Sequence, residues 1–383
     1  MKKRFFSVLI AIALSLSGFT LRSFAVPQNS HGLSVSARSA ALLDLDSGSL
    51  LYEKNADERL GMASTTKIMT ALVAAEEGKL DRVISIPKEA VGIEGSSIYL
   101  TEGESLTLRQ LLYALLLSSA NDAAVAIAIA VSGSVESFVE LMNEKALSLG
   151  LKSTHFTNPH GLYDDDHYTT AYELALISAE ALNDPVIREI ASTYKRSIPK
   201  GEDKCGRVLV NHNKMLRLYD GAIGLKTGFT KKTGRCLVSA AERDGLTLIA
   251  VTLNAPDDWN DHCSMLDLGF KNYERVTVYE AGDFSYALPL TNGKENYVLL
   301  TNAESISFTL PKSRKKATVK VYTLRHFEFA PIKEGATLGR LVCEAEGMTA
   351  DSRLIAAYGV DSRANQKKGF FEKIADFFSK LFS

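Results

Sequence analysis

The chain has 383 residues, of which 46% are hydrophobic and 23% charged, values typical of a globular protein with room for two domains. The formal net charge is −1, and four basic residues and no acid lie within residues 1–25, so the rest of the chain carries −5. A mildly acidic body excludes nucleic acid as the expected partner, because nucleic-acid-binding proteins usually present a basic face.

Residues 1–25 have the features of a secretory signal. Basic residues at positions 2–4 precede an apolar run over 5–16, and Ser23-Phe24-Ala25 is a small-x-small cleavage site. An uncleaved membrane anchor is the alternative. Both interpretations place the rest of the chain outside the cytoplasm.

Helix and strand signals follow one another over residues 26–275, which we expect to form the first and larger domain. A hairpin is expected over 39–53, followed by a buried helix that begins near residue 62 and ends near Gly78. A short strand at 83–86 and a polar loop at 94–104 come next. Further helices are expected after a Thr107 cap and over 123–131, 135–149, 170–182 and 186–192.

The end of this domain reads as three strands joined by turns, at 222–227, 236–242 and 246–254, which implies antiparallel pairing. A helix capped by Asp257 or Asp258 follows over 259–273. From 276 to 360 the pattern changes to short β-rich runs, which predict a small all-β domain with strands at 276–279, 297–300, 306–310, 317–322 and 327–329.

The last segment, 361–383, reads as a polar linker and an amphipathic helix. Aromatic and aliphatic residues recur at helical spacing over 370–383, with charged residues between them. Packing on the protein is the ordinary role of such a helix. At the end of an exported chain we instead predict reversible attachment to the outer face of the cytoplasmic membrane.

The four cysteines, Cys205, Cys236, Cys263 and Cys343, show no zinc-type spacing. Export permits disulfides, and Cys205 with Cys236 is one of three possible first pairings. Four buried free thiols are an equally good interpretation, and no chemistry is assigned to them.

Three short motifs occur in order along the chain: Ser64-x-x-Lys67, Ser119-x-Asn121 and Lys226-Thr227-Gly228. Each has an ordinary alternative as a helix cap or a strand end. Together, and each at the edge of a fitting element, they match the motif set of serine β-lactamases and penicillin-binding proteins.

The first two motifs supply a nucleophile and its proton transfers. Ser64 needs a base to take its proton, and Lys67 lies one helical turn away. We expect Ser119 to pass a proton to the leaving amine. The side-chain amide of Asn121 can hold both Lys67 and a substrate amide.

The third motif predicts a substrate with a free carboxylate next to the cleaved bond. Lys226 and Thr227 present a cation and a hydroxyl to that carboxylate. Gly228 would let the substrate backbone lie against the strand. The main-chain N–H groups of Ser64 and Phe229 are expected to form the oxyanion hole.

With these motifs the chain resembles the D-alanyl-D-alanine carboxypeptidases, which are low-molecular-mass penicillin-binding proteins of the serine peptidase type. The resemblance extends from the signal through 63–70, 119–123, 158–162 and 224–230 to the β domain and tail. It implies an α+β catalytic domain over 26–275, with an antiparallel sheet flanked by helices and a helical cluster beside it. It also implies removal of the terminal D-Ala from peptidoglycan pentapeptide stems through an acyl-enzyme, with penicillins acylating the same serine and no metal or other cofactor.

The sequence departs from the usual motif residues in three places. Ala120 stands where Gly is common and is expected to crowd the site slightly, and Met62 stands where Pro often occurs. Phe229 replaces a His found in some members, which predicts an altered substrate preference or pH profile. His160 lies in a motif-like loop and reads as structural.

A β-lactamase shares all three motifs and is the nearest alternative function. It requires fast deacylation, and Glu180 with Asn183 is the only passable pair for holding the water. A non-catalytic penicillin-binding or wall-peptide-binding relative is a second alternative. Endopeptidase or transpeptidase activity on crosslinked stems also stays possible, because these reactions share the same chemistry and differ only in the molecule that accepts the acyl group.

The acidic triplet 164–166 beside His167 lacks calcium-loop spacing and reads as a solvated loop.

Overall fold

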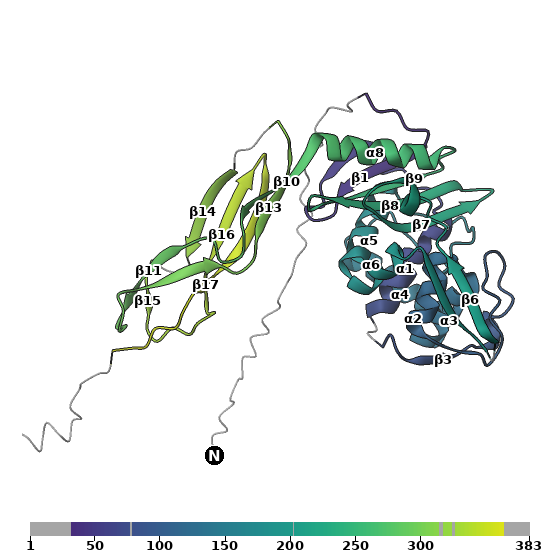
Figure 1. Cartoon of the computed structure of the whole chain (residues 1–383), viewed down its shortest axis with the longest axis horizontal. Helices are drawn as coiled ribbons and strands as arrows, with labels where there is room; N and C mark the ends of the chain where they lie inside the picture. The colour runs from purple at the N-terminus through teal and green to yellow at the C-terminus, as the bar shows by residue number, and fades with distance from the viewer. Residues whose placement is uncertain (1–31, 77–78, 202, 314–316, 324–325, 364–383) are drawn as a thin grey trace, which may run out of the picture. The chain divides into compact units, whose positions relative to one another are not determined.

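The computed structural model describes residues 32–76, 79–201, 203–313, 317–323 and 326–363 (Figure 1). The predicted signal peptide (1–25) and the predicted amphipathic helix (370–383) lie outside these ranges. The described residues form two compact units. The first holds residues up to 43, 50–241 and 249–264, and the second holds 44–49, 242–248 and residues from 265 onward.

A five-stranded sheet in the order β2-β1-β9-β8-β7 is the frame of the N-terminal part. The strands are β1 (Ser39–Asp44), β2 (Leu50–Lys54), β7 (Ala222–Thr230), β8 (Gly234–Arg243) and β9 (Leu246–Leu253). Every residue of β1 and β9 is buried, because helices cover both faces (Figure 1). The predicted hairpin and meander are confirmed, with β1 antiparallel to β2 and β7 antiparallel to β8. Strand β7 is an outer strand of the sheet.

A cluster of six helices lies against one face of this sheet, and α8 (Asp258–Asn272) lies against the other (Figure 1). The cluster consists of α1 (Lys67–Glu76), α2 (Leu108–Leu117), α3 (Asn121–Ser132), α4 (Val135–Ser148), α5 (Ala171–Asn183) and α6 (Pro185–Ser192). Helix α1 is its centre, since all of its residues except Glu76 are buried. Helix α2 starts at the predicted Thr107 cap, whose Oγ1 accepts from the Gln110 N–H at 3.2 Å.

No single helix among the described residues is long and apolar enough to cross a membrane; α3 and α4 reach that length only together, across an 84° bend. The short elements of the N-terminal part are β3 (Val83–Ser85), β4 (Ser105–Thr107), α7 (Met215–Leu218) and the 3₁₀ turns η1 (Ala63–Thr66) and η2 (Lys88–Ala90).

One hairpin of the N-terminal part was not predicted, the pair β5 (Lys195–Lys200) and β6 (Asp203–Val210). Strand β5 buries only Ile198, so its sequence lacks the apolar alternation that identifies a half-buried strand. In β8, the Cys236 side chain is a buried free thiol and forms no disulfide.

The C-terminal unit contains the predicted all-β domain. A six-stranded sheet has the order β14-β16-β17-β12-β11-β15, and β10 pairs with β13. The strands are β10 (Tyr273–Tyr279), β11 (Tyr286–Thr291), β12 (Tyr297–Asn302), β13 (Ile306–Pro311), β14 (Ala317–Thr323), β15 (Glu328–Phe329), β16 (Thr337–Ala345) and β17 (Met348–Ala356). They enclose an apolar core that includes Leu288, Val298, Phe308, Leu341 and Leu354.

The predicted α+β fold class is therefore confirmed, but three strands of the β domain were missed. In β16 and β17 polar residues interrupt the apolar positions, and the two-residue turn Glu346-Gly347 between them carries no Asn-Gly or Asp-Gly signal. In β11 only Leu288 is fully buried.

Candidate active site

The three sequence motifs come together at the junction of the sheet and the helical cluster. Ser64 lies in the 3₁₀ turn η1, and Lys67 is the first residue of α1. The sequence predicted that Ser64 lies within the helix, but in the structure Ser64 precedes α1. Ser119 and Asn121 lie at the junction of α2 and α3, and Lys226 lies in the outer strand β7.

Strand β7 packs directly against the turn that carries Ser64. A Cβ atom added to Gly228 would lie 3.0 Å from the Ser64 nitrogen and 3.1 Å from the Met62 oxygen. The absence of a side chain at Gly228 thus permits this approach, a reason different from the substrate contact predicted from sequence. The close packing of β7 on this turn also places the Ser64 N–H beside the strand that continues to Phe229. Phe229 is 65% exposed.

The Lys67 amino group makes three polar contacts in a fully buried position. Its Nζ lies 3.1 Å from Ser64 Oγ, 2.7 Å from Asn121 Oδ1 and 2.5 Å from the His160 carbonyl oxygen. Asn121 Oδ1 and the His160 carbonyl only accept hydrogen bonds, so they take two N–H donors. The remaining valence of nitrogen faces the Ser64 hydroxyl.

Burial holds the pKa of Lys67 well below its usual range, and repulsion from the Lys226 cation adds to the effect. The Asp122 carboxylate opposes it. A neutral amine keeps two N–H donors for Asn121 and His160 and has one lone pair, which is then directed at the Ser64 hydroxyl. The geometry and the electrostatics therefore both favour Lys67 as a base.

Lys226 is 1% exposed, and burial lowers its pKa to about 7. Its Nζ donates to the Thr227 carbonyl oxygen at 2.8 Å. Burial is the main cause of a lowered pKa at His212, and the Lys226 cation is the second cause. The main-chain N–H of His212 donates to the carbonyl oxygen of Leu117 at 3.2 Å, two residues before Ser119. Sequence reasoning did not identify His212, because its link to Lys226 is purely spatial.

The loop containing His160 supports the nucleophile turn from a third side. A Cβ on Gly161 would lie 1.9 Å from the Ala63 carbonyl oxygen, so only glycine fits here. His160 Nδ1 accepts from the Leu162 N–H at 3.2 Å, and burial is the main reason that its pKa falls to about 3. The neutral ring thus bonds the main chain of its own loop, and its structural role stays a prediction.

The acidic residues 164–166 are exposed, as predicted for a solvated loop, whereas His167 beside them is buried. Its Nδ1 accepts from the Thr157 N–H at 3.0 Å, so the proton of the neutral ring lies on Nε2, 2.7 Å from Thr66 Oγ1. Burial lowers the pKa of His167 to about 4. The ring thus connects this loop to η1.

Among the described residues, no three His, Cys, Asp or Glu side chains are arranged to hold a metal ion.

Asp122 follows Asn121 and was also missed by the sequence analysis. It is fully buried and accepts hydrogen bonds from the Leu100 N–H at 3.0 Å and from Ser97 Oγ at 2.6 Å. The signal that could have found it is a charged residue at the start of an otherwise apolar, alanine-rich helix. Ala120, expected to crowd the site, is fully buried, so its methyl group packs in the core.

Glu180, the candidate for holding a deacylating water, is engaged elsewhere. Glu180 lies on α5, and its Oε1 accepts from Nζ of Lys145 on α4 at 3.2 Å. Lys145 also bonds Glu76.

Comparison with known proteins agrees with this geometry. The family model described as D-alanyl-D-alanine carboxypeptidase matches residues 25–257, and the model described as the C-terminal domain of penicillin-binding protein 5 matches 273–358. The chain is 35% identical to the D-alanyl-D-alanine carboxypeptidase DacF of Bacillus subtilis over 381 residues, 96% of each protein. It is 32% identical to DacC of Escherichia coli, covering 94% of this chain and 92% of that protein.

A solved structure is also similar over most of the chain. Penicillin-binding protein 5 from Haemophilus influenzae superposes with a TM-score of 0.70 and 29% identity, covering 86% of this chain and 99% of that one. The motifs, their convergence around a buried lysine and these similarities together confirm the family predicted from sequence. The chain belongs to the D-alanyl-D-alanine carboxypeptidase family of serine peptidases.

Proposed function

We propose that the chain removes the terminal D-Ala from peptidoglycan pentapeptide stems through an acyl-enzyme on Ser64. The observation that carries this proposal is the arrangement around Lys67. Its buried Nζ lies 3.1 Å from Ser64 Oγ, and its two other contacts are acceptors. A neutral Lys67 can therefore accept a proton only from Ser64.

The reaction then follows in two balanced stages. Ser64 Oγ attacks the carbonyl carbon of the D-Ala–D-Ala bond while Lys67 takes its proton, and the N–H groups of Ser64 and Phe229 bind the oxyanion. The proton taken by Lys67 passes to Ser119 as Ser119 gives its own proton to the departing D-Ala amine, so both side chains return to their starting state. Water then attacks the ester carbonyl while Lys67 takes one of its protons; the C–O bond to Ser64 breaks, the hydroxyl of the water stays on the shortened peptide as its new carboxylate, and Lys67 returns the proton to Ser64 Oγ. Penicillins open on the same serine and leave a more persistent ester.

Lys226 and Thr227 are proposed to hold the terminal carboxylate of the substrate. This requires the charged form of Lys226, whose pKa in the free enzyme is about 7. We therefore expect kcat/KM to fall by about tenfold per pH unit well above that value. In Lys226→Arg the guanidinium stays charged, so the alkaline fall should disappear even if the maximum is lower. A pH profile of D-Ala release from pH 6 to 10 measures this, and an unchanged fall in the variant contradicts the assignment.

A β-lactamase or a non-catalytic binder would use the same motifs, so product analysis is the test of function. Mass spectrometry of a pentapeptide and of benzylpenicillin, each incubated with the protein, distinguishes a carboxypeptidase from a β-lactamase and from a non-catalytic binder. We expect a tetrapeptide, free D-Ala and a penicilloyl adduct on the protein. Rapid multiple-turnover release of penicilloic acid indicates a β-lactamase, and an intact peptide indicates a binder. The pairing of Glu180 with Lys145 disfavours the β-lactamase.

The tail is proposed to attach the exported enzyme to the outer face of the cytoplasmic membrane. Its apolar residues at helical spacing over 370–383 support this proposal. Deleting residues 365–383 should release the protein from membranes and leave catalysis on soluble peptides nearly normal. Membrane flotation and a D-Ala assay measure both properties. A matched pair, Phe377→Ser with Phe378→Ser against Ser379→Ala, separates the apolar face from the polar one. A truncated protein that still floats with membranes contradicts the proposal.

A further inference from the structure

Backbone strain marks the active site, and it also marks one residue that is neither in a motif nor next to one. Nine residues other than glycine have a left-handed φ in the described part of the chain. Four of them are Asn or Asp, which tolerate this conformation, and Glu346 lies in a two-residue hairpin turn that requires it. The other four are Ala63 (+47°), Tyr99 (+56°), Ser119 (+59°) and Leu225 (+102°).

Three of these four positions lie within or directly before the three motifs. Ala63 precedes the nucleophile, Ser119 is the proposed proton relay, and Leu225 precedes Lys226. Left-handed backbone costs about 1 kcal/mol or more for such residues, and it persists where the surroundings hold it in place, typically at functional sites. Tyr99 is the fourth position, and the residue is 82% exposed, the highest value among the exposed large hydrophobic residues that the structure describes.

The loop that carries Tyr99 is part of the wall of the active site. The Ser96 carbonyl oxygen accepts from the Asn121 N–H at 2.7 Å, and the Glu94 carbonyl oxygen accepts from Asn121 Nδ2 at 2.5 Å. A Cβ on Gly95 would lie 2.8 Å from Asn121 Nδ2. The same asparagine contacts Lys67, so residues 94–96 lie one side chain away from the proposed base.

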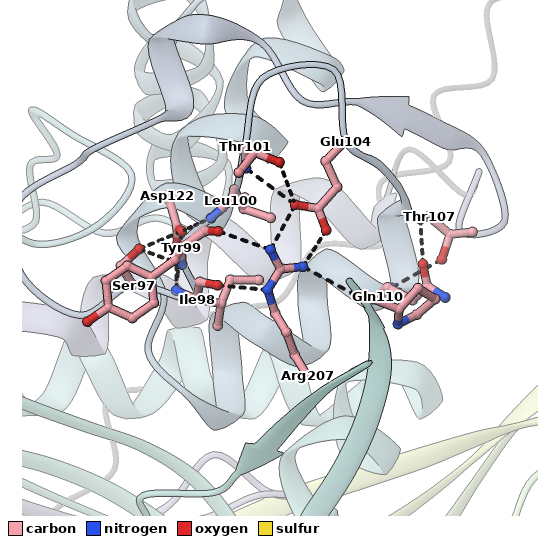
Figure 2. Close-up of polar contacts among 11 residues, drawn as sticks. Ser97, Ile98, Tyr99, Leu100, Thr101, Glu104, Thr107, Gln110, Asp122 and Arg207 are labelled. Atoms are coloured by element: carbon pink, nitrogen blue, oxygen red, sulfur yellow. Dashed lines mark hydrogen bonds and ion pairs between the residues drawn. The ribbon is translucent and has the colours of Figure 1, made fainter. Parts of the chain in front are cut away.

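Two buried charged groups hold the main chain around Tyr99 from opposite sides (Figure 2). The Asp122 carboxylate accepts from the N–H groups of Ile98 and Leu100, at 3.2 and 3.0 Å. The Arg207 guanidinium of β6 donates to the carbonyl oxygens of Ile98 and Tyr99, at 2.8 and 3.0 Å.

Other partners complete this network. Arg207 is itself fixed by Glu104, whose Oε2 accepts from Nη2 at 2.8 Å. The Tyr99 N–H donates to Ser97 Oγ at 2.9 Å. Figure 2 shows the Tyr99 ring pointing away from Arg207. Both main-chain groups of Ile98, the carbonyl oxygen of Tyr99 and the N–H of Leu100 thus bond buried charged side chains, which holds Tyr99 in its strained conformation.

We propose that Tyr99 contacts the stem-peptide residues that precede the terminal D-Ala pair, and that it contributes to the choice among them. This rests on the proposed function. The carboxylate end of the substrate lies at Lys226, and Asn121 is proposed to hold an amide on the acyl side of the cleaved bond. The chain upstream of that amide then passes the loop of Tyr99. An exposed aromatic ring on a fixed loop binds aliphatic side chains with little loss of conformational entropy.

The test compares two substrates, a pentapeptide stem and acetyl-D-Ala-D-Ala, which lacks the upstream residues. We expect Tyr99→Ala to lower kcat/KM for D-Ala release from the pentapeptide by about tenfold and to leave the short substrate unchanged. Tyr99→Phe should retain the wild-type values on both. An equal loss on both substrates, or no loss on either, overturns the proposal. Failure of the wild-type protein to release D-Ala from either substrate instead contradicts the proposed function.

A second variant separates contact from strain. Tyr99→Gly also lacks the ring, but glycine adopts this φ without cost, so its unfolding temperature should exceed that of Tyr99→Ala. Its kcat/KM on the pentapeptide should be as low as that of Tyr99→Ala. Recovery of activity in Tyr99→Gly would show that the ring is not the contact, and equal unfolding temperatures would show that the position is not strained.

Discussion

Replacing Ser64 with alanine is expected to abolish both acylation by penicillin and release of D-Ala. Among the described residues, the Ser64 hydroxyl is the only group bonded to the Lys67 amine that can form an ester, so its loss removes the covalent route entirely. Activity should fall by at least about 10⁴-fold, as for other nucleophile deletions. Labelling with a fluorescent penicillin and a D-Ala assay measure the two losses independently.

Ser119→Ala is the matched control, since it removes the second serine of the site. Ser119 is proposed to relay a proton, so this variant should be labelled more slowly but to completion. Full labelling of Ser64→Ala, with loss of labelling in Ser119→Ala, would reverse the two roles. Both variants change one oxygen atom, and near-wild-type unfolding temperatures would show that the fold is intact.

Replacing Lys67 with methionine is expected to lower the acylation rate by about 10² to 10⁴-fold, the usual contribution of a general base. Methionine has a similar length and no lone pair that accepts a proton effectively at neutral pH. The wild-type acylation rate should fall towards acid pH as Lys67 becomes protonated, and the variant should lose this dependence. Stopped-flow acylation by a chromogenic cephalosporin between pH 5 and 9 measures both effects.

Lys145→Met is the control for Lys67→Met, because Lys145 bonds Glu76 and Glu180 away from the site. It should leave the acylation rate and its pH dependence unchanged. If Lys67→Met retains more than one tenth of the wild-type rate, another group must take the Ser64 proton. The neutral His160 side chain would then be the next candidate to replace.

The sequence was sufficient to predict the fold class and the residues of the three motifs, because each motif sits at the boundary of an element with a clear pattern. The apolar stretch of α1 and the cap at Thr107 are local signals. Hairpin β5–β6 was missed because Ile198 alone is buried in β5. Arg207, which that hairpin contributes to the site wall, could not be identified without its partner 103 residues away.

The supporting residues were missed for the same physical reason. The contact of the His160 carbonyl oxygen with Lys67 is a main-chain interaction, which side-chain identity does not reveal. The strain at Tyr99 depends on Asp122 and Arg207, which approach the loop from different elements. Motifs thus locate the groups that react, whereas the groups that hold them become visible only when the chain is folded.

The burial of Lys226 has a consequence for the energetics of ligand binding. A cation whose pKa is lowered to about 7 by burial is partly neutral in the free enzyme at neutral pH. An anionic ligand placed against it restores the charge, so complex formation draws a proton from solution, and more so as the pH rises above 7. The observed binding enthalpy of a peptide or a penicillin will then depend on the ionisation enthalpy of the buffer. Because the ligand binds only the folded state, saturation with it also shifts the folding equilibrium towards the native enzyme.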